Sequence, residues 1–372
     1  MPEEPVHEEP SRGATPGEPI AWEVALAVAR QALRVAPGPQ LSADAFVALR
    51  RDFAEATARA DRLVERATGL CSASGPSHAL VTDRAGWVEA NIGSFRRLLR
   101  PVAERLASSK HARRAMNPVS RVAAGTEVGL LLAWMSGRVL GQYDLLPVEG
   151  TSDDAVYYVG PNIVELERRF GFPAPQFRLW IAIHEVTHRL QFTGVPWLRE
   201  YFLGLVERGV DLSSPDPAQL LERLREAVAE VRAGRNPLAE AGVVGLLATS
   251  DQLATLRGAQ ALMSLLEGHG DVVMSSAARA EIPDGEHFAS VLAERRKSGG
   301  TLARALRSAI GLEGKLRQYA EGEHFVESVL ATGGEELFAR VWEAPEMLPS
   351  LEEIREPRRW VERAQGRASA PA

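Results

Sequence analysis

The segment HEVTH at positions 184–188 places two histidines four residues apart, with a glutamate directly after the first. On an α-helix, side chains four residues apart share a face, so His184 and His188 can reach one metal ion. Glu185 lies about 100° around the helix from His184, close enough to touch a water molecule at that ion without ligating it. Neutral imidazoles, an open coordination position and a neighbouring carboxylate suit hydrolysis by activated water. The pattern predicts one Zn²⁺ per chain, with Glu185 as the catalytic base.

The residues around this motif are strongly apolar, as the segment FRLWIAIHEVTHRLQF shows. Their spacing predicts a helix with one well-buried side. The simpler explanation is an ordinary amphipathic helix that carries two surface histidines and a solvated glutamate. Unpaired histidines and a glutamate within so apolar a helix would be costly, however, and this favours a metal site.

A third ligand must come from elsewhere in the chain, and LLEGHGDVVM at 265–274 offers two candidates. Glu267 and Asp271 are four residues apart and share a helix face, so Asp271 can accept the outer N–H of a ligating histidine while Glu267 ligates. His269 competes, because a site of three histidines is equally sound chemistry. It lies about 200° around the helix from Glu267, so both cannot face one ion. We favour Glu267, because Asp271 supports it.

Two glycines, Gly268 and Gly270, flank His269 in this segment. Each costs about 1 kcal/mol of helix propensity. The cost is explained if two backbones approach closely here, as at a metal site that is packed against a second helix.

Three further side chains could line the site. AVYYV (155–159) could be an edge strand that aligns an extended substrate, and Tyr158 could then face the cleft. Tyr319, within RQYAEGEHF, could hydrogen-bond a developing oxyanion, and His269 could face the cleft without ligating. The alternative for both tyrosines is a structural place in the core.

The elements that must hold these residues are mostly helices. Apolar residues recur every three or four positions along much of the chain, and AVYYV is the best strand candidate. The expected fold class is therefore mainly α with a small β element (α+β). The segment 122–141 is apolar nearly all round, which is typical of a buried core helix. The other helices are expected at 22–35, 43–68, 86–107, 162–170, 176–192, 197–208, 216–232, 251–274, 302–330 and 334–342, with a loop at 69–80.

Composition and pattern divide the chain into four regions. Residues 1–19 are rich in proline and glutamate and are predicted to form a disordered tail, as are residues 363–372. A helical region is expected at 20–150, and the catalytic region at 151–362.

Composition also excludes several function classes. Acidic residues number 49 and basic residues 43, a net charge of −6, which makes nucleic acid a poor partner. Cys71 is the single cysteine, so intrachain disulfides and cysteine-based zinc sites are excluded and a reducing cytoplasm is the expected compartment. No apolar stretch reaches the roughly 20 residues that span a bilayer, and the opening MPEEPVHEEP is unlike a secretory signal. An oligomeric state is not indicated.

HEVTHRLQF, VPWLREYF and LLEGHGDVVM together resemble a zincin-like bacterial hydrolase family that is associated with deazaflavin-cofactor biosynthesis proteins. The similarity extends over most of the chain, through blocks such as VTDRAGWVEANI, YYVGPNI and VWEAPEMLPSLEEI. It implies a zincin-like metallopeptidase core around the HExxH helix. In that family pattern His184, His188 and Glu267 match metal ligands, and Glu185 matches the catalytic base.

These observations favour a cytoplasmic zinc hydrolase, a metallopeptidase that cleaves peptide or amide bonds with water activated by Glu185. The alternative is a helical scaffold or regulatory protein whose zinc site is structural or catalytically retired. The two differ at Glu185, because a structural site has no use for a carboxylate directly after a ligand. A structural site also tends to be closed by four protein ligands, and the sequence offers three.

Overall fold

A computed structural model describes residues 18–100, 103–104, 117–146, 155–209, 250–278, 281–297 and 312–368. In these ranges the fold is mainly α-helical with one three-stranded sheet, which confirms the predicted fold class. None of the described helices has the length and apolar character needed to cross a bilayer. The helix predicted at 216–232 and nearly all of the tail predicted at 1–19 lie outside the described residues.

The chain forms two compact units, and the first comprises residues 1–40 and 82–139. Its described helices are α1 (Trp22–Val35), α3 (Arg84–Leu98) and α6 (Pro118–Ser136). Gly129 of α6 lies directly on the backbone of α1, where a Cβ would be 2.4 Å from the carbonyl oxygen of Ala25. The segment predicted to be a helix buried on all sides corresponds to α6. The predicted burial is wrong in part, because Val122 and Leu130 are about half exposed.

The second unit, residues 41–81 and 140–372, contains the HEVTH segment. Its described helices are α2 (Ala43–Thr68), α7 (Gly160–Phe170), α8 (Ala174–Gly194), α9 (Leu198–Gly209), α12 (Ser250–Ala278), α13 (Gly285–Lys297), α15 (Leu312–Ala339), α16 (Leu351–Arg355) and α17 (Pro357–Ala368). Two short 3-10 turns, η1 (Arg340–Trp342) and η2 (Pro345–Met347), lie between α15 and α16.

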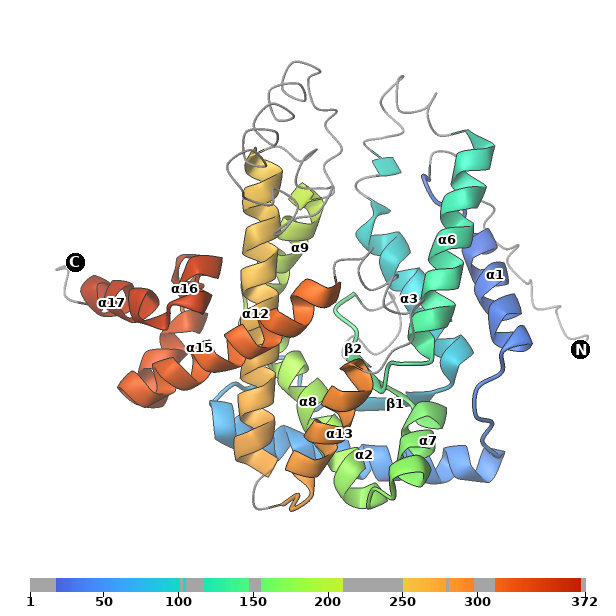
Figure 1. Ribbon diagram of the computed structural model, residues 1–372, viewed down its shortest axis with the longest axis horizontal. Coiled ribbons are helices and arrows are strands. Elements are labelled where there is room, and N and C mark those ends of the chain that lie inside the picture. The colour runs from blue at the N-terminus through green and yellow to red at the C-terminus, as the bar shows by residue number, and fades with distance from the viewer. Residues whose placement is uncertain are drawn as a thin grey trace, which may run out of the picture. The chain divides into compact units, whose positions relative to one another are not determined.

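The core of the second unit forms where α2 packs along α8 (Figure 1). Phe53 of α2 and Ile183 and Val186 of α8 are fully buried in one apolar cluster. Burial of each such side chain contributes about 1.5–3 kcal/mol to folding. α2 therefore belongs to the unit that holds the HEVTH segment, whereas the division predicted from the sequence assigns it to the region 20–150.

The sheet has the strand order β1-β3-β2, so β3 (Ala155–Val159) is its central strand. β2 (Gly141–Tyr143) pairs with β3 in antiparallel register, with Gly141 opposite Tyr158. The strand predicted at 155–159 is present, but the expectation that it forms an edge is wrong. The edges are β2 and β1 (His78–Thr82), and β1 begins within the predicted loop. Strands of three and five residues are too short to give a clear alternating pattern.

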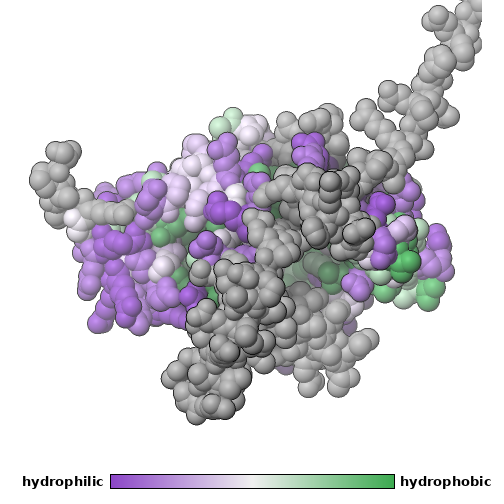
Figure 2. All heavy atoms as spheres, turned by 90° about the horizontal axis from the view of Figure 1, so that it is seen from above, coloured by the Kyte–Doolittle hydropathy of each residue, from purple (hydrophilic) through white to green (hydrophobic). Residues whose placement is uncertain are grey.

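The C-terminal helix α17 corrects the predicted tail, since residues 363–368 are helical. Trp360 and Ala364 are fully buried, and the indole of Trp360 packs edge-on against Phe325 of α15. The remaining side of α17 is charged, and Figure 2 shows a strongly hydrophilic surface over the C-terminal helices. So polar a composition hides the few buried residues that hold the helix in place.

Candidate metal centre

The HEVTH segment lies in the middle of α8, between α2, α12 and the sheet (Figure 1). Ile183, Val186 and Leu190 are fully buried and anchor the helix in the core. His184 and His188 are half-buried and turn toward α12, one helical turn apart. The apolar spacing predicted from the sequence therefore places both imidazoles on one side of a rigid helix.

The ligand atoms of His184, His188 and Glu267 lie within 4.8 Å of one another. The Nε2 atoms of the two imidazoles are 3.2 Å apart, and Nε2 of His188 is 3.8 Å from Oε2 of Glu267. Tetrahedral zinc, with bonds of about 2.0–2.2 Å, separates its ligand atoms by about 3.4 Å. The three side chains therefore fit a zinc ion in donor type and in spacing.

Two glycines follow Glu267 closely on α12, and they have different surroundings. Gly270 lies against the imidazoles, where a Cβ would be 3.5 Å from Cε1 of His188. Gly268 lies on α15, where a Cβ would be 2.1 Å from the carbonyl carbon of Gly322. The close backbone approach predicted at these glycines is therefore present at Gly268, whereas at Gly270 a Cβ would make only ordinary van der Waals contact with the imidazole.

Glu185 is buried beside the imidazoles, with 7% of its surface exposed. Burial raises the pKa of its carboxyl group to about 7; the charge of His188 lowers this pKa and that of Glu267 raises it. A hydrogen bond from the backbone of Tyr143 in β2 also lowers it. Gly141, in the same strand, makes the room, because a Cβ there would lie 2.6 Å from Oε1 of Glu185. The carboxylate is thus held between β2 and the histidines.

Comparisons with known proteins agree with this geometry. A family model described as zincin-like metallopeptidase matches residues 20–361. The chain belongs to the zincin-like metallopeptidase family. It is also similar to a crystal structure from Chloroflexus aurantiacus, described as a candidate hydrolase with a novel fold, at 31% identity and a TM-score of 0.67 over 93% of this chain and 99% of that one. A comparison with curated proteins gives no match.

The zincin-like family predicted from HEVTH and its flanking segments is thereby confirmed. The family description and the related structure support a hydrolase of zincin type. The association with deazaflavin cofactors stays a prediction, and so does the bond that the protein cleaves.

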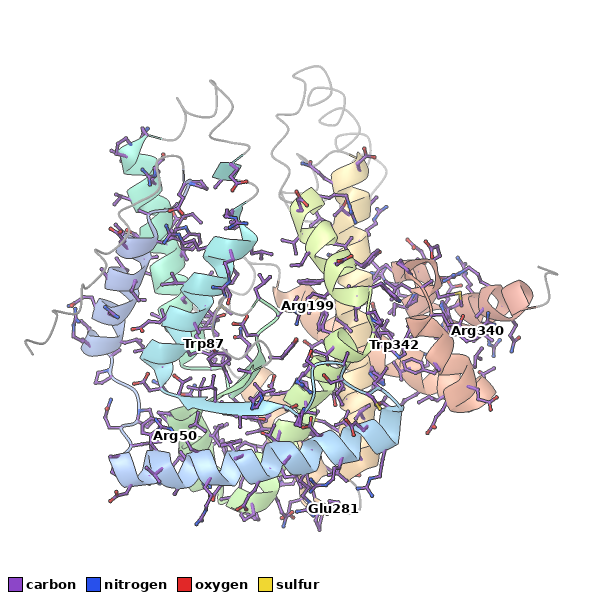
Figure 3. All side chains as sticks on the ribbon, turned by 180° about the vertical axis from the view of Figure 1, so that it is seen from behind. Arg50, Trp87, Arg199, Glu281, Arg340 and Trp342 are labelled. Carbon is purple, nitrogen blue, oxygen red and sulfur yellow. The ribbon has the colours of Figure 1, made fainter. Side chains whose placement is uncertain are left out.

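The competing ligand predicted for this site, His269, is not among the side chains whose ligand atoms converge. Its ring packs against Phe338 at 5.1 Å and against Trp342 at 5.5 Å between centroids, and Figure 3 shows Trp342 beside α12. Burial, together with the charge of His188, lowers the pKa of His269 to about 3, so its imidazole is neutral. The structure brings Glu267 to His184 and His188, and it does not bring His269 there.

Two further polar residues lie near these side chains, and only one of them was predicted from the sequence. Asp271 lies half-buried on α12, one turn after Glu267, and its contact with a ligating histidine stays a prediction. Gln191 was not predicted from the sequence, and its Oε1 is 3.0 Å from Nδ1 of His188. A polar side chain three residues after a ligand, inside so apolar a helix, is the signal that could have identified it.

The two tyrosines named from the sequence have different outcomes. Tyr158 lies in the core, where its hydroxyl is 2.7 Å from that of Thr57 and its ring stacks on Phe53. Burial raises its pKa, so it stays protonated, and its packing matches the structural alternative. Tyr319 belongs to the first part of α15, whose side chains lie outside the described residues.

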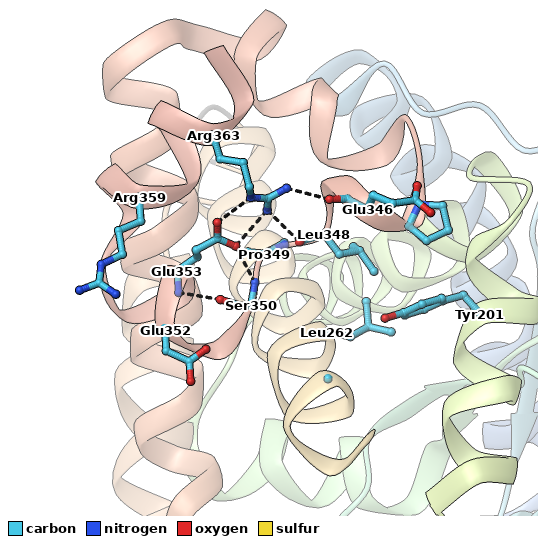
Figure 4. A pocket seen from close by; sticks show the side chains of 12 residues that line it. Tyr201, Leu262, Glu346, Leu348, Pro349, Ser350, Glu352, Glu353, Arg359 and Arg363 are labelled. Atoms are coloured by element: carbon cyan, nitrogen blue, oxygen red, sulfur yellow. Dashed lines mark hydrogen bonds and ion pairs between the residues drawn. The ribbon is translucent and has the colours of Figure 1, made fainter. Parts of the chain in front are cut away.

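A separate pocket of about 580 Å³ opens beside α9, α12 and the C-terminal helices (Figure 4). Arg363 on its wall donates hydrogen bonds to the carboxylate of Glu353 and to the carbonyl oxygens of Glu346 and Leu348. The residues that line it do not include His184, His188 or Glu267. This pocket is therefore distinct from the metal centre.

Proposed function

We propose that this protein is a zinc-dependent hydrolase that cleaves peptide or amide bonds. The observation that carries the proposal is the convergence of His184, His188 and Glu267, with the buried carboxylate of Glu185 beside them. Two imidazoles and one carboxylate are the ligand set of zinc sites that keep a coordination position open for catalysis. One zinc ion per chain is expected.

When bound, zinc supplies the Lewis acidity that polarises a carbonyl group and lowers the pKa of water. The protein's own part is to move the proton. Glu185 accepts a proton from the attacking water and passes it to the leaving amine. The hydrogen bond from Tyr143 fixes this carboxylate, and the missing side chain of Gly141 lets it lie against β2.

An extended peptide is the substrate class that we propose. Both sides of β3 are occupied by neighbouring strands, so a peptide that pairs with the sheet must use an edge. Of the two edges, β2 is the strand that contacts Glu185. On the grounds of composition, we propose a cytoplasmic protein that uses neither nucleic acid nor membrane as a partner.

Replacement of Glu185 by glutamine tests the proposal. Glu185→Gln keeps the shape of the side chain but cannot take the proton, so peptide-library cleavage should fall by ~10²–10⁴ while the protein still binds zinc. Metal analysis of both proteins, prepared without chelators, is the matched control. A wild type that binds zinc and cleaves nothing, or a glutamine variant as active as wild type, would instead support a structural or retired zinc site in a scaffold protein.

A further inference from the structure

Gln191 lies at the centre of a buried hydrogen-bond chain behind the metal centre. It follows His188 by three residues on α8, and its side chain is fully buried. Its Oε1 is 3.0 Å from Nδ1 of His188. Its Nε2 is 3.0 Å from the carbonyl oxygen of Leu266 and 2.9 Å from Nδ1 of His269, both on α12. One amide therefore joins a zinc ligand on α8 to the helix that carries Glu267.

The carbonyl group of Leu266 decides how this amide is oriented. A carbonyl oxygen only accepts hydrogen bonds, so the group that faces Leu266 must be the NH₂ of Gln191. Oε1 then faces His188, and because it is an acceptor, Nδ1 of His188 must carry the proton. The other ring nitrogen, Nε2, is left with its lone pair. This is the atom that lies 3.8 Å from Oε2 of Glu267.

His269 is the third hydrogen-bond partner of this amide. The second N–H of Gln191 points at Nδ1 of His269, which must accept and therefore carries its proton on Nε2. A flipped amide would set its oxygen against the carbonyl oxygen of Leu266, which has no proton to donate. The contacts of His269 with Phe338 and Trp342 hold the ring in this orientation.

We propose that Gln191 is a positioning residue that fixes the tautomer and the orientation of His188 for zinc, with Leu266 and His269 as its anchors. The proposal rests on the metal site of the proposed function, but not on the bond that the enzyme cleaves. It also gives His269 a defined role two residues from a ligand. An amide orients the imidazole without adding a second buried negative charge beside Glu185.

The variant Gln191→Leu tests this, because leucine is apolar, of similar volume, and can neither accept from His188 nor donate to Leu266. Zinc affinity, measured by competition with a chelator, should fall by ~10–100-fold, as is typical when the partner of a metal-binding histidine is lost. The matched control is Thr187→Val, which removes another fully buried hydrogen bond of α8, from the Thr187 hydroxyl to the carbonyl oxygen of Ile183. This control should bind zinc like wild type.

A second measurement reads the tautomer directly, without any substitution at Gln191. In ¹⁵N-histidine-labelled, metal-free wild type, the long-range ¹H–¹⁵N spectrum should show His188 protonated at Nδ1, with the signal assigned through His188→Gln. Protonation at Nε2 alone would overturn the proposal, even if Gln191→Leu did not fold. Wild-type zinc affinity in Gln191→Leu, or an equal loss in Thr187→Val, would overturn it too. A wild type that binds no zinc but shows the Nδ1 proton would contradict the proposed function and leave the positioning of His188 standing.

Discussion

Two regions of the second unit gather polar and charged side chains in opposite ways. Around the pocket of Figure 4, donors and acceptors match, because Arg363 satisfies Glu353 and two backbone carbonyl groups. At the metal centre, one carboxylate oxygen and two imidazole nitrogens converge, and a cation between them satisfies all three. The first arrangement is complete without a ligand and stabilises the fold. The second would be completed by an ion, and in this it differs from a structural cluster.

The largest expected effect is on zinc affinity, when one of the three converging side chains is removed. Glu267→Ala should abolish tight zinc binding, with a loss beyond the ~10–100-fold typical of residues that only orient ligands. His269→Ala should lose no more than ~10-fold, because Gln191 keeps its bond to Leu266. Zinc titration of both variants against wild type measures the difference. Retention of zinc by Glu267→Ala, with loss by His269→Ala, would exchange their roles.

An effect of intermediate size on the free energy of unfolding is expected when glycines are replaced by alanine, one on α12 near the metal centre and one on the C-terminal helix α17. Gly268→Ala sets a Cβ 2.1 Å from the backbone of Gly322, so α12 and α15 must separate, at about 1–3 kcal/mol of unfolding free energy. Gly366→Ala on α17 meets nothing within 4 Å and should stabilise by about 0.5–1 kcal/mol. Urea unfolding of the two variants gives both values. Equal effects would show that the helix contact at Gly268 is not a tight one.

The sequence reveals the parts of the site that depend on local spacing. HEVTH and the apolar residues around it lie within a few helical turns, so their periodicity predicts α8 and the side of it that carries both histidines. Glu267 could be proposed for the same reason, since it stands in an apolar helix beside two costly glycines. The family resemblance then supported all three ligands.

The parts that the sequence hides depend on contacts between distant segments. Gly141 and Tyr143 hold Glu185 from a three-residue strand, which has no recognisable pattern. Gln191 meets His269 across 78 residues, and no local rule reveals that pairing. The assignment of α2 to the second unit fails from sequence for the same reason, because its partner α8 lies more than a hundred residues later.

The smallest expected effect concerns the pH dependence of stability, through the ion pair of Arg363 and Glu353 at the pocket. Burial raises the pKa of Glu353, but hydrogen bonds from Arg363 and from the backbone of Ser350 lower it by a larger amount. The pKa of this carboxyl group is therefore below its ordinary value. A lowered pKa means that this carboxylate stabilises the folded state above the pKa of the unfolded chain and loses that contribution as pH falls. Wild type should therefore lose more Tm than Glu353→Gln between pH 6 and about pH 3.

The size of this pH effect is limited because Glu353 is partly exposed. Such pairs contribute about 0.2–1 kcal/mol, and 1 kcal/mol shifts Tm by about 2–4 °C in a domain of this size. Thermal melts at the two pH values measure it, with Glu362→Gln, an exposed carboxylate of α17, as the control. Parallel curves for wild type and Glu353→Gln would show that the ion pair of Glu353 and Arg363 does not stabilise the fold.

The split of the ligand set between α8 and α12 sets an order of events during synthesis. Glu267 is translated 79 residues after His188, a delay of roughly 4–16 s at the usual rates of chain elongation. During that interval α8 offers an ion only two histidines, and the amide of Gln191 has no carbonyl group of Leu266 to bind. High-affinity loading of the proposed zinc ion must therefore wait until α12 has emerged and docked, so the nascent protein would acquire the ion only after α8 has found its partner helix.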